Sequence, residues 1–290
     1  MFEKVGKFHP DKLCDRIAGA IVDLAYKKAN DGKELCYDVH PKVAVEVLLG
    51  HGKCYIINET SQHLDDKEVY NIVEKITGNS FIETVYNEVP QDPILAGNQE
   101  TLHCGDNGIF KGIKTSLEER ELTRCVQLIN DKYPYDGKYI IDSGEIIACQ
   151  SNCKELPIKT KAFNPLGYWT GGANVDSGAT NRKLGSDMGR AVTGGGLHGK
   201  DLSKADVSVN IYLHLLANQP ESIINRRDEV YASCAIGDSM VKVSLPTEIH
   251  FINYEEIVAK ASEYIKSIGG FEKLAEWGLI RWKNTKYMKW

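Results

Sequence analysis

Apolar residues follow two different periods along this chain, and each period predicts one kind of element. Leu13, Ile17 and Ile21 recur every four residues, which is typical of an amphipathic helix. Val43 and Val45 alternate with other residues, as in a strand that buries one face. Together these patterns predict helices over residues 11–30, 65–76, 117–131 and 254–268, and strands over residues 42–49, 53–59 and 139–148.

The order of these elements indicates an α+β fold. His51 and Gly52 separate two predicted strands and form a short hairpin connection, and a helix follows the second strand. Helices arranged in this way cover one face of a sheet. Residues 86–108 contain proline, glycine and asparagine and predict a loop. The loop is long for a connection, and such loops are often functional.

Residues 207–215 give two conflicting signals. Val207, Val209 and Ile211 alternate strictly with other residues, which favours a strand. The stretch before them, KDLSKAD at 200–206, is instead typical of a helix start. The pattern by itself leaves both interpretations open.

The composition narrows the class of protein. Of the 290 residues, 42% are hydrophobic and 26% are charged, which is typical of soluble globular proteins and excludes collagen-like, coiled-coil and disordered chains. The net charge of −5 argues against a general nucleic-acid binder. No apolar run is long enough to cross a membrane, and the opening residues lack the hydrophobic core of a secretion signal. We therefore expect a cytoplasmic protein.

The eight cysteines are dilute and lie mostly in hydrophobic stretches. Cys149 and Cys153 form the one pair that is close in sequence, and no CxxC motif accompanies it. A structural zinc or disulfide role stays open, but buried reduced thiols are the preferred interpretation.

The densest chemical signal is the glycine-rich segment 164–206. Glycines there allow a backbone to approach a ligand closely and to present N–H groups. Cations and carboxylates are interspersed, which suits a nucleotide polyphosphate held together with Mg²⁺. These charged residues are Arg182, Lys183, Lys200, Lys204, Asp176, Asp187, Asp201 and Asp206. Solvated surface loops are the alternative, and neither a P-loop nor a dinucleotide-binding fingerprint is present.

Two shorter motifs are weak when each is considered alone. His9-Pro10-Asp11-Lys12 begins a predicted helix and could bind phosphate and metal, or could be a surface helix cap. Residues 105–108, GDNG, could be a simple turn.

The order of these motifs resembles the S-adenosylmethionine synthetases (methionine adenosyltransferases) of the bacterial and eukaryotic type, in a shortened form. The matching stretches are FHPDK at 8–12, HCGDNG at 103–108, DGK at 136–138, NPLGYWTGGANVDSGATNRK at 164–183 and GGGLHGKDLSKAD at 194–206. The family's glycine before HPDK is Phe8 here, and the missing length falls in the loop over methionine, the central unit and the region before the C-terminus.

The resemblance implies a fold and an organisation. It implies three similar α+β units around a pseudo-threefold axis, with helices on one face of mixed sheets, and it makes 204–216 a helix. The expected units are residues 1–95, a shortened central unit at 96–162, and residues 163–290 with the phosphate-binding segment. It also implies active sites shared between two subunits of a homodimer, with a tetramer left open.

The resemblance further implies an activity. ATP and L-methionine would react to give S-adenosylmethionine, and the tripolyphosphate released would be hydrolysed. Two Mg²⁺ ions and K⁺ would take part. The thioether sulfur is itself the nucleophile, so the protein has to align the reactants and stabilise the charge on the leaving triphosphate.

Site residues are implied by the same motifs. ATP would contact His9, Asp136, Lys138, Trp169, Arg182, Lys183, Leu197, Lys200 and Lys204, of which His9, Lys138, Arg182 and Lys200 would be catalytic. Methionine would contact Glu59, Gln91, Asp106 and Asp176. Asp11 and Asp206 would bind Mg²⁺, Glu46 would bind K⁺, and Glu3 would be a further metal-site residue.

Two alternatives remain at this stage. A family relative could hydrolyse ATP or tripolyphosphate without capturing methionine, because the loop over methionine is shortened. A subunit could instead bind nucleotide without catalysis and regulate a partner, although the retained cations and metal carboxylates argue against this.

Overall fold

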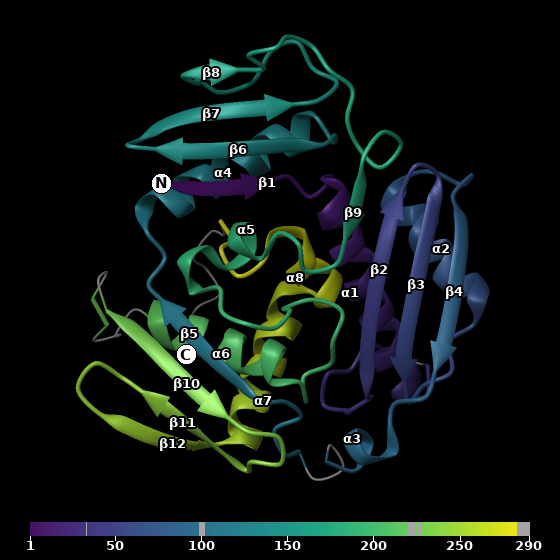
Figure 1. Cartoon of the computed structure of the whole chain (residues 1–290), viewed down its shortest axis with the longest axis vertical. Helices are drawn as coiled ribbons and strands as arrows, with labels where there is room; N and C mark the ends of the chain where they lie inside the picture. Colours follow the sequence, from purple (N-terminus) through teal and green to yellow (C-terminus); the bar gives the residue numbers. More distant parts are fainter. Residues whose placement is uncertain (33, 99–101, 220–223, 226–227, 283–290) are drawn as a thin grey trace.

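Three four-stranded sheets lie around a central group of helices in a computed structural model of the chain (Figure 1). The structure describes residues 1–32, 34–98, 102–219, 224–225 and 228–282. One or more long helices pack against each sheet. Among the described residues, no helix is long and apolar enough to cross a membrane.

The first sheet has the strand order β4-β3-β2-β9 and packs on helix α1. Its strands are β2 (Val43–Gly50), β3 (Lys53–Thr60), β4 (Glu83–Val89) and β9 (Ser177–Ala179), and its helices are α1 (Pro10–Ala29) and α2 (Asp66–Thr77). The β2–β3 hairpin turns at His51 and Gly52, which both have positive φ. Such values favour the tight two-residue turns of hairpins. The sheet is mixed, because β3 and β4 are parallel.

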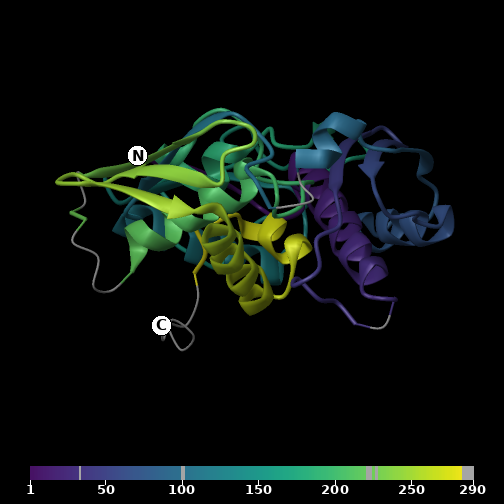
Figure 2. The same ribbon diagram turned by 90° about the horizontal axis from the view of Figure 1, so that it is seen from below.

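The second sheet has the order β12-β11-β10-β5 and is fully antiparallel. Its strands are β5 (Gly108–Ile113), β10 (Glu229–Cys234), β11 (Met240–Ser244) and β12 (Ile249–Asn253). Helix α6 (Ala205–Asn218) packs on β5 and β10, and α7 (Tyr254–Ile268) packs on α6. Figure 2 shows α7 beneath strands β10 to β12.

The third sheet has the order β1-β6-β7-β8 and packs on α4. Its elements are β1 (Phe2–Val5), β6 (Gly137–Asp142), β7 (Glu145–Gln150), β8 (Ala162–Phe163) and α4 (Leu117–Lys132). Ser116 and Glu119 form a capping box at the start of α4. The remaining helices are α3 (Pro93–Asn98), α5 (Leu184–Met188), the 3₁₀ turn Gly189–Ala191 and α8 (Phe271–Trp277), which packs on α1.

The structure confirms the expected α+β class with mixed sheets, and it confirms most of the predicted elements. It also resolves the ambiguity at residues 204–216 in favour of a helix. Val207, Val209 and Ile211 are all buried in α6, as are residues on its other faces. Residues 205–211 are buried on every side of the helix, including the polar Asp206 and Asn210, so the apolar residues there do not mark out a single buried face.

Two sequence predictions about local structure were wrong. The single strand predicted at 139–148 is the β6–β7 hairpin, which turns at Ser143 and Gly144 with positive φ. The loop predicted at 86–108 begins inside β4 and includes α3, while 99–101 lie outside the described residues. Strand β4 escaped detection because none of its residues is fully buried and the adjacent apolar residues Val85 and Tyr86 break the alternation of apolar and polar types.

Each sheet combines strands from distant parts of the chain. Strand β9 pairs with β2, β10 pairs with β5, and β1 pairs with β6. The three-unit division at 95/96 and 162/163 stays a prediction about domains, whereas the sheets themselves are assembled across those positions.

Candidate active site

Two parts of the glycine-rich segment lie along one edge of strand β2, opposite β3. Ala179 pairs with Leu48, and the Thr180 N–H donates to the Val47 carbonyl. Further along the strand, Lys200 bridges to Ala44. Four residues of a strand span about 13 Å. The segment before Arg182 and the segment at Lys200 therefore meet β2 at points about 13 Å apart.

Helix α1 begins directly beside this edge. A Cβ on Gly178 would lie 2.2 Å from the Pro10 carbonyl carbon, so only glycine permits this approach. The Asp11 carboxylate accepts the Ala179 N–H at 2.9 Å, and Asp15 accepts the Asn181 N–H at 2.7 Å. The histidine-led helix start and the glycine-rich segment, 168 residues apart at this contact, are thus in direct contact.

Asp11 is the centre of an open charged cluster, which we define as His9, Asp11, Arg182 and Lys183. Lys183 Nζ lies 2.9 Å from one Asp11 oxygen, and Arg182 lies 3.6 Å from the other. Burial acts to raise the pKa of Asp11, but the hydrogen bonds from Lys183 and Ala179 outweigh it and lower the pKa. The carboxylate is therefore ionised, and two cations lie beside it at the helix N-terminus.

His9 caps α1 and is uncharged at neutral pH. Its Nδ1 accepts the Asp11 N–H at 3.2 Å. Burial and the nearby Lys183 lower its pKa to about 4, although Asp11 acts in the opposite direction. Because Nδ1 is an acceptor, we assign the proton of the neutral ring to Nε2. His9 therefore offers a neutral hydrogen-bond donor among cations.

Asp136 and Trp169 lie together near the same cluster. A Cβ on Gly171 would lie 2.5 Å from the Trp169 ring and 2.9 Å from an Asp136 oxygen. The Gly172 N–H donates to Asp136 at 3.2 Å. Burial raises the pKa of Asp136 to about 6, and the charges of Asp176 and Asp11 add to this effect. This shared influence indicates that the Asp136 corner is close to Asp11.

Lys138 and Glu3 form an ion pair of 3.1 Å on neighbouring strands β6 and β1. Both side chains are about half exposed, so the pair is open to exchange with a ligand. Lys138 also contributes to lowering the pKa of His9. The structure therefore brings Lys138 within electrostatic reach of the open cluster.

Lys200 and Asp206 form a second site at the start of α6. Their ion pair is 2.5 Å long, and Asp206 also accepts the Gly196 N–H at 3.3 Å. A Cβ on Gly195 would lie 2.1 Å from Asp206, so glycine is required there. A hollow of about 530 Å³ opens at this point. It is lined by Asp106, Asn107, Gly108, Ile109, Thr193, Gly194, Gly195 and Asp206.

Glu46 and Glu59 lie on the outer face of the first sheet. Ala44 pairs with Glu59, and Glu46 pairs with Ile57, so the two glutamates are diagonal neighbours. Such neighbours have Cα atoms about 7–8 Å apart. Glu46 accepts a hydrogen bond from the Thr180 hydroxyl, which ties it to the edge that carries Arg182.

Gln91 follows β4 by two residues, and Val89 pairs with Glu59. Its side chain is buried, and both polar atoms of its amide lack a hydrogen-bond partner among the described residues. Buried polar groups are usually paired because leaving one unpaired costs free energy. This amide is therefore available to a ligand.

Three other predicted residues have distinct positions. Leu197 is 1% exposed within the main hydrophobic core, so its side chain does not face a ligand and only its backbone could contact one. Lys204 occupies the N-cap position of α6 and is also buried. Asp176 is exposed, and its carboxylate accepts the Ser177 N–H.

A second charged cluster lies buried behind the first and was missed by sequence reasoning. We call Lys12, Asp15, Asp187 and His198 the closed network. Lys12 Nζ lies 2.8 and 2.7 Å from the two Asp187 oxygens and 3.1 Å from Asp15. His198 Nε2 lies 2.8 Å from Asp187. Asp15, Asp187 and His198 could together hold a metal ion, but the Lys12 ammonium already occupies the centre of their donors.

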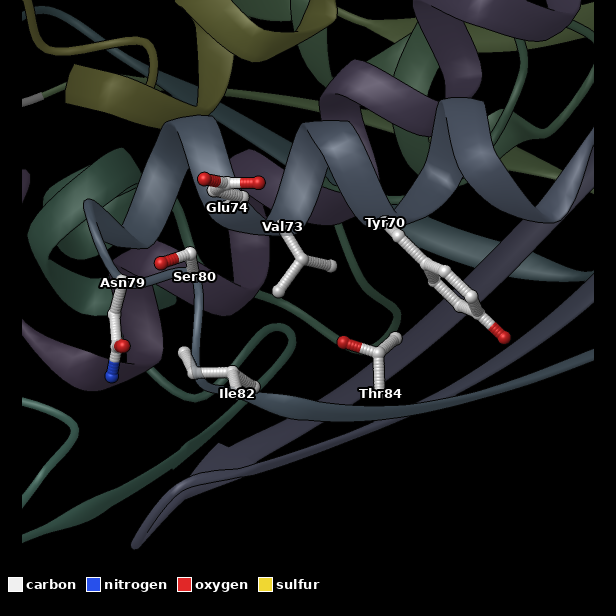
Figure 3. A pocket seen from close by; sticks show the side chains of 7 residues that line it. All are labelled: Tyr70, Val73, Glu74, Asn79, Ser80, Ile82 and Thr84. Atoms are coloured by element: carbon white, nitrogen blue, oxygen red, sulfur yellow. The ribbon is translucent and has the colours of Figure 1, made fainter.

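A different hollow of about 270 Å³ lies between α2 and β4 (Figure 3). Val73, Ile82 and Thr84 face one another across it. It is lined by Tyr70, Val73, Glu74, Asn79, Ser80, Ile82 and Thr84, and none of the predicted site residues is among them. Glu74 is its sole charged residue, so the hollow lacks the cations that a phosphate ligand requires.

Comparisons with known proteins show what the chain resembles in sequence. No protein-family model matches the chain. The chain is 28% identical to an S-adenosylmethionine synthase of Acholeplasma laidlawii over 81% of its length and 78% of that protein. It is 27% identical to one of Mycoplasmopsis synoviae over 71% of its length and 68% of that protein.

A solved structure shares the fold. An unusual S-adenosylmethionine synthetase from Campylobacter jejuni superposes with a TM-score of 0.70 and 21% identity, over 96% of this chain and 94% of that one. This likeness concerns the fold alone, and the sequence matches add a similarity that runs over most of the chain. The chain is therefore a divergent relative of the S-adenosylmethionine synthases, similar to them in sequence and sharing the fold of one of them.

Proposed function

We propose that this chain is a methionine adenosyltransferase, which forms S-adenosylmethionine from ATP and L-methionine. The observation that carries the proposal is the contact between the start of α1 and the glycine-rich segment. This contact gathers His9, Arg182 and Lys183 around Asp11, with Lys200 further along the same edge of β2. Such a row of cations fits an extended triphosphate.

The protein's part in this reaction is electrostatic. The methionine sulfur attacks ribose C5′, and the bond to the triphosphate oxygen breaks, so negative charge grows on the leaving group. Arg182, Lys183, Lys138 and Lys200 would bind the phosphate oxygens, and the neutral His9 would donate from Nε2 near the bond that breaks. Preorganised donors of this kind lower the barrier because they need no rearrangement as charge develops.

The adenosine would lie in the Asp136–Trp169 corner. The Trp169 ring offers a face for stacking on the adenine base. Asp136 accepts a backbone N–H from Gly172, which fixes its carboxylate beside that ring. Asp136 would then accept a hydrogen bond from the nucleoside.

Methionine would be held by Glu59, Gln91, Asp106 and Asp176. Carboxylates suit its ammonium group, and the buried unpaired amide of Gln91 can donate to its carboxylate. Glu59 and Gln91 lie at the same end of the first sheet through the Glu59–Val89 pairing. This grouping supports a methionine site beside Lys200.

The carboxylates fit the two Mg²⁺ ions that such a reaction uses. Asp11 and Asp206 supply hard oxygen donors, and each lies beside lysines that would also contact phosphate. Mg²⁺ usually takes one or two protein carboxylates and completes its shell with phosphate oxygens and water. Bound Mg²⁺ would neutralise charge on the leaving oxygens. Glu46 would hold K⁺, and Glu3 is a further possible metal ligand once Lys138 turns to phosphate.

A second copy of the chain would cover the outer face of the first sheet and share its site. Leu48, Tyr55 and Val85 form one row across three strands, and they are 50%, 44% and 46% exposed. An exposed apolar face of this kind is typical of an interface. Glu46 and Glu59 lie on the same face, so a partner there would border the site. We therefore propose a homodimer, which could pair further into a tetramer, located in the cytoplasm.

One incubation tests the activity. The purified chain is mixed with ATP, L-methionine, Mg²⁺ and K⁺, and S-adenosylmethionine is detected by mass. Lys200→Ala and Asp11→Ala should each lower turnover by about 100-fold, the usual effect of removing one charge-stabilising group. Lys28→Ala, which removes a partly exposed ion pair of α1 with Glu68, should leave turnover unchanged.

The same incubation separates the alternatives. Phosphate release without S-adenosylmethionine, and independent of methionine, would contradict the transferase and favour a hydrolase. Binding of ATP by calorimetry with no product would favour a non-catalytic subunit. Unchanged turnover in both variants would contradict the assignment of the site.

A further inference from the structure

Two cysteines that are 130 residues apart in sequence meet beside the proposed site. Cys104 precedes β5 and is fully buried, and Cys234 ends β10 and is half-buried. Their sulfur atoms are 3.0 Å apart, and both residues are free cysteines. A disulfide bond is about 2.0 Å long, so the two atoms need to move only about 1 Å to bond.

The backbone around the pair is held on both sides. Cys104 exchanges hydrogen bonds with the β10–β11 turn: its N–H donates to Asp238, and its carbonyl accepts from Gly237. The Asn107 side chain accepts the Ile236 N–H at 2.7 Å. The two sulfurs are therefore brought together by a fixed frame and not by a chance approach of loops.

The pair connects directly to the hollow at Asp206. The Cys104 sulfur lies 3.0 Å from the Asp106 carbonyl and can donate its thiol hydrogen to it. Asp106 lines the hollow together with Gly195 and Asp206. A change at the Cys104 sulfur therefore alters the support of a wall of the proposed site.

We propose that Cys104 and Cys234 form a reversible redox pair, which hydrogen peroxide oxidises to a disulfide that lowers the activity of the adjacent site. Peroxide would enter beside the half-buried Cys234 and reach the Cys104 sulfur, which lies 3.0 Å behind it. One thiol attacks a peroxide oxygen to give a sulfenic acid and water, and the second sulfur displaces the hydroxyl as another water. Two thiols and one peroxide thus give one disulfide and two waters, and a dithiol reductant reverses the change.

Electrostatics agree with this geometry. The hydrogen bond between the two sulfurs lowers the pKa of Cys104, although burial opposes it, and the same bond raises the pKa of Cys234. Cys104 therefore loses its proton first. The thiolate form is the nucleophile in such reactions. Oxidation removes the thiol hydrogen that Cys104 shares with Asp106. It also ties residue 104 to β10, so it displaces the turn that carries Asp106.

The experiment reads the thiols and the activity separately. The purified chain is treated with peroxide, digested without reduction and analysed by mass. We expect a peptide that joins Cys104 to Cys234 with the loss of two hydrogens, and six titratable thiols in place of eight under denaturing conditions. Turnover should fall by about tenfold or more, the effect of a small displacement in a site, and dithiothreitol should restore it.

Matched variants give the controls. Cys234→Ser and Cys104→Ser should each abolish the cross-link and keep turnover through peroxide treatment, whereas Cys149→Ser, another half-buried cysteine, should behave as the parent chain does. Eight titratable thiols after treatment, or a cross-link between other cysteines, would overturn the proposal. A cross-link without any change of turnover would overturn the link to the site. The inference about activity rests on the proposed function, but the mass measurement is independent of it, so a chain without transferase activity would still show the cross-link.

Discussion

The first turns of α1 carry two clusters of charges that differ in their access to solvent. In the closed network, Lys12 is 1% exposed and its carboxylate partners are fully buried. In the open cluster, the Arg182 side chain is 57% exposed and that of Lys183 is 19% exposed. The closed network has its charges paired within the protein, whereas the open cluster keeps cations that can exchange one carboxylate for a ligand. The start of α1 thus contacts a buried network that stabilises the fold on one side and an open cluster that can bind a ligand on the other.

The largest effect should come from breaking the closed network. Asp187→Asn leaves Lys12 and His198 facing an amide in a buried setting, and breaking a buried pair from one side costs about 3–5 kcal/mol. We expect urea unfolding to show a loss of stability of this size. Asp176→Asn, which changes an exposed carboxylate, is the control and should leave the midpoint unchanged. Equal midpoints for both variants would show that the closed network does not stabilise the fold.

The opposite result is expected for the open cluster. Lys183→Ala removes a cation from the proposed phosphate site, so turnover should fall by about 100-fold. The unfolding midpoint should stay close to that of the parent chain, because a partly exposed ion pair stabilises little. Activity assays and urea unfolding on the same sample measure both. A large loss of stability with unchanged turnover would reverse the roles assigned to the two clusters.

The pH dependence of stability sharpens the comparison. Burial raises the pKa of Asp136 to about 6, so this group favours folding when protonated and loses that contribution as pH rises through 6. Asp136→Asn removes the ionisation. The unfolding free energy of the variant, relative to that of the parent, should therefore rise by about 1–3 kcal/mol from pH 4 to pH 7.5. The closed network acts oppositely, because the pKa of Asp187 is held well below its usual value of 3.8, so its contribution persists over this range and is lost only on acidification below it. Urea unfolding of the parent and of Asp136→Asn at both pH values tests the Asp136 prediction. A stability difference between the two chains that does not vary with pH would contradict it.

The smallest effect concerns Asn181, which precedes Arg182 in the chain and hydrogen-bonds two members of the closed network. Its N–H donates to Asp15, and its amide bonds the N–H and carbonyl of His198. Its φ of 63° is left-handed, so Asn181→Gly keeps the backbone and removes only the side-chain bonds. We expect a loss of about 1–2 kcal/mol, the net value of such bonds. An unchanged unfolding free energy would indicate that these side-chain bonds do not stabilise the closed network.

Local patterns predicted the elements that have one buried face. Helix α7 buries one face, and its predicted range matches the structure. Helix α1 was predicted almost as closely, but residues 10–19 are all buried and only its second half has a solvent-facing side. Helix α6 has no exposed face, so its period was ambiguous and only the family resemblance indicated a helix. The Ser143–Gly144 turn was missed because the apolar pattern continues through both strands of its hairpin.

The site residues that lie in short sequence motifs could be predicted. The cations near Asp11 lie in stretches that match the family. The closed network was not predicted, because Lys12 and Asp187 are 175 residues apart and each fits a surface position when considered alone. The same holds for Cys104 and Cys234, which pair across 130 residues. Spatial pairing of this kind leaves no local period in a sequence.

The sharing of strands between distant segments has a consequence for synthesis. The first sheet is completed by β9. Strand β2 therefore has unpaired backbone groups along one edge until residue 179 has left the ribosome. Open strand borders invite pairing with other chains. Nascent chains of this protein should therefore depend on chaperones for much of their translation, and no third of the chain is expected to refold when it is made alone.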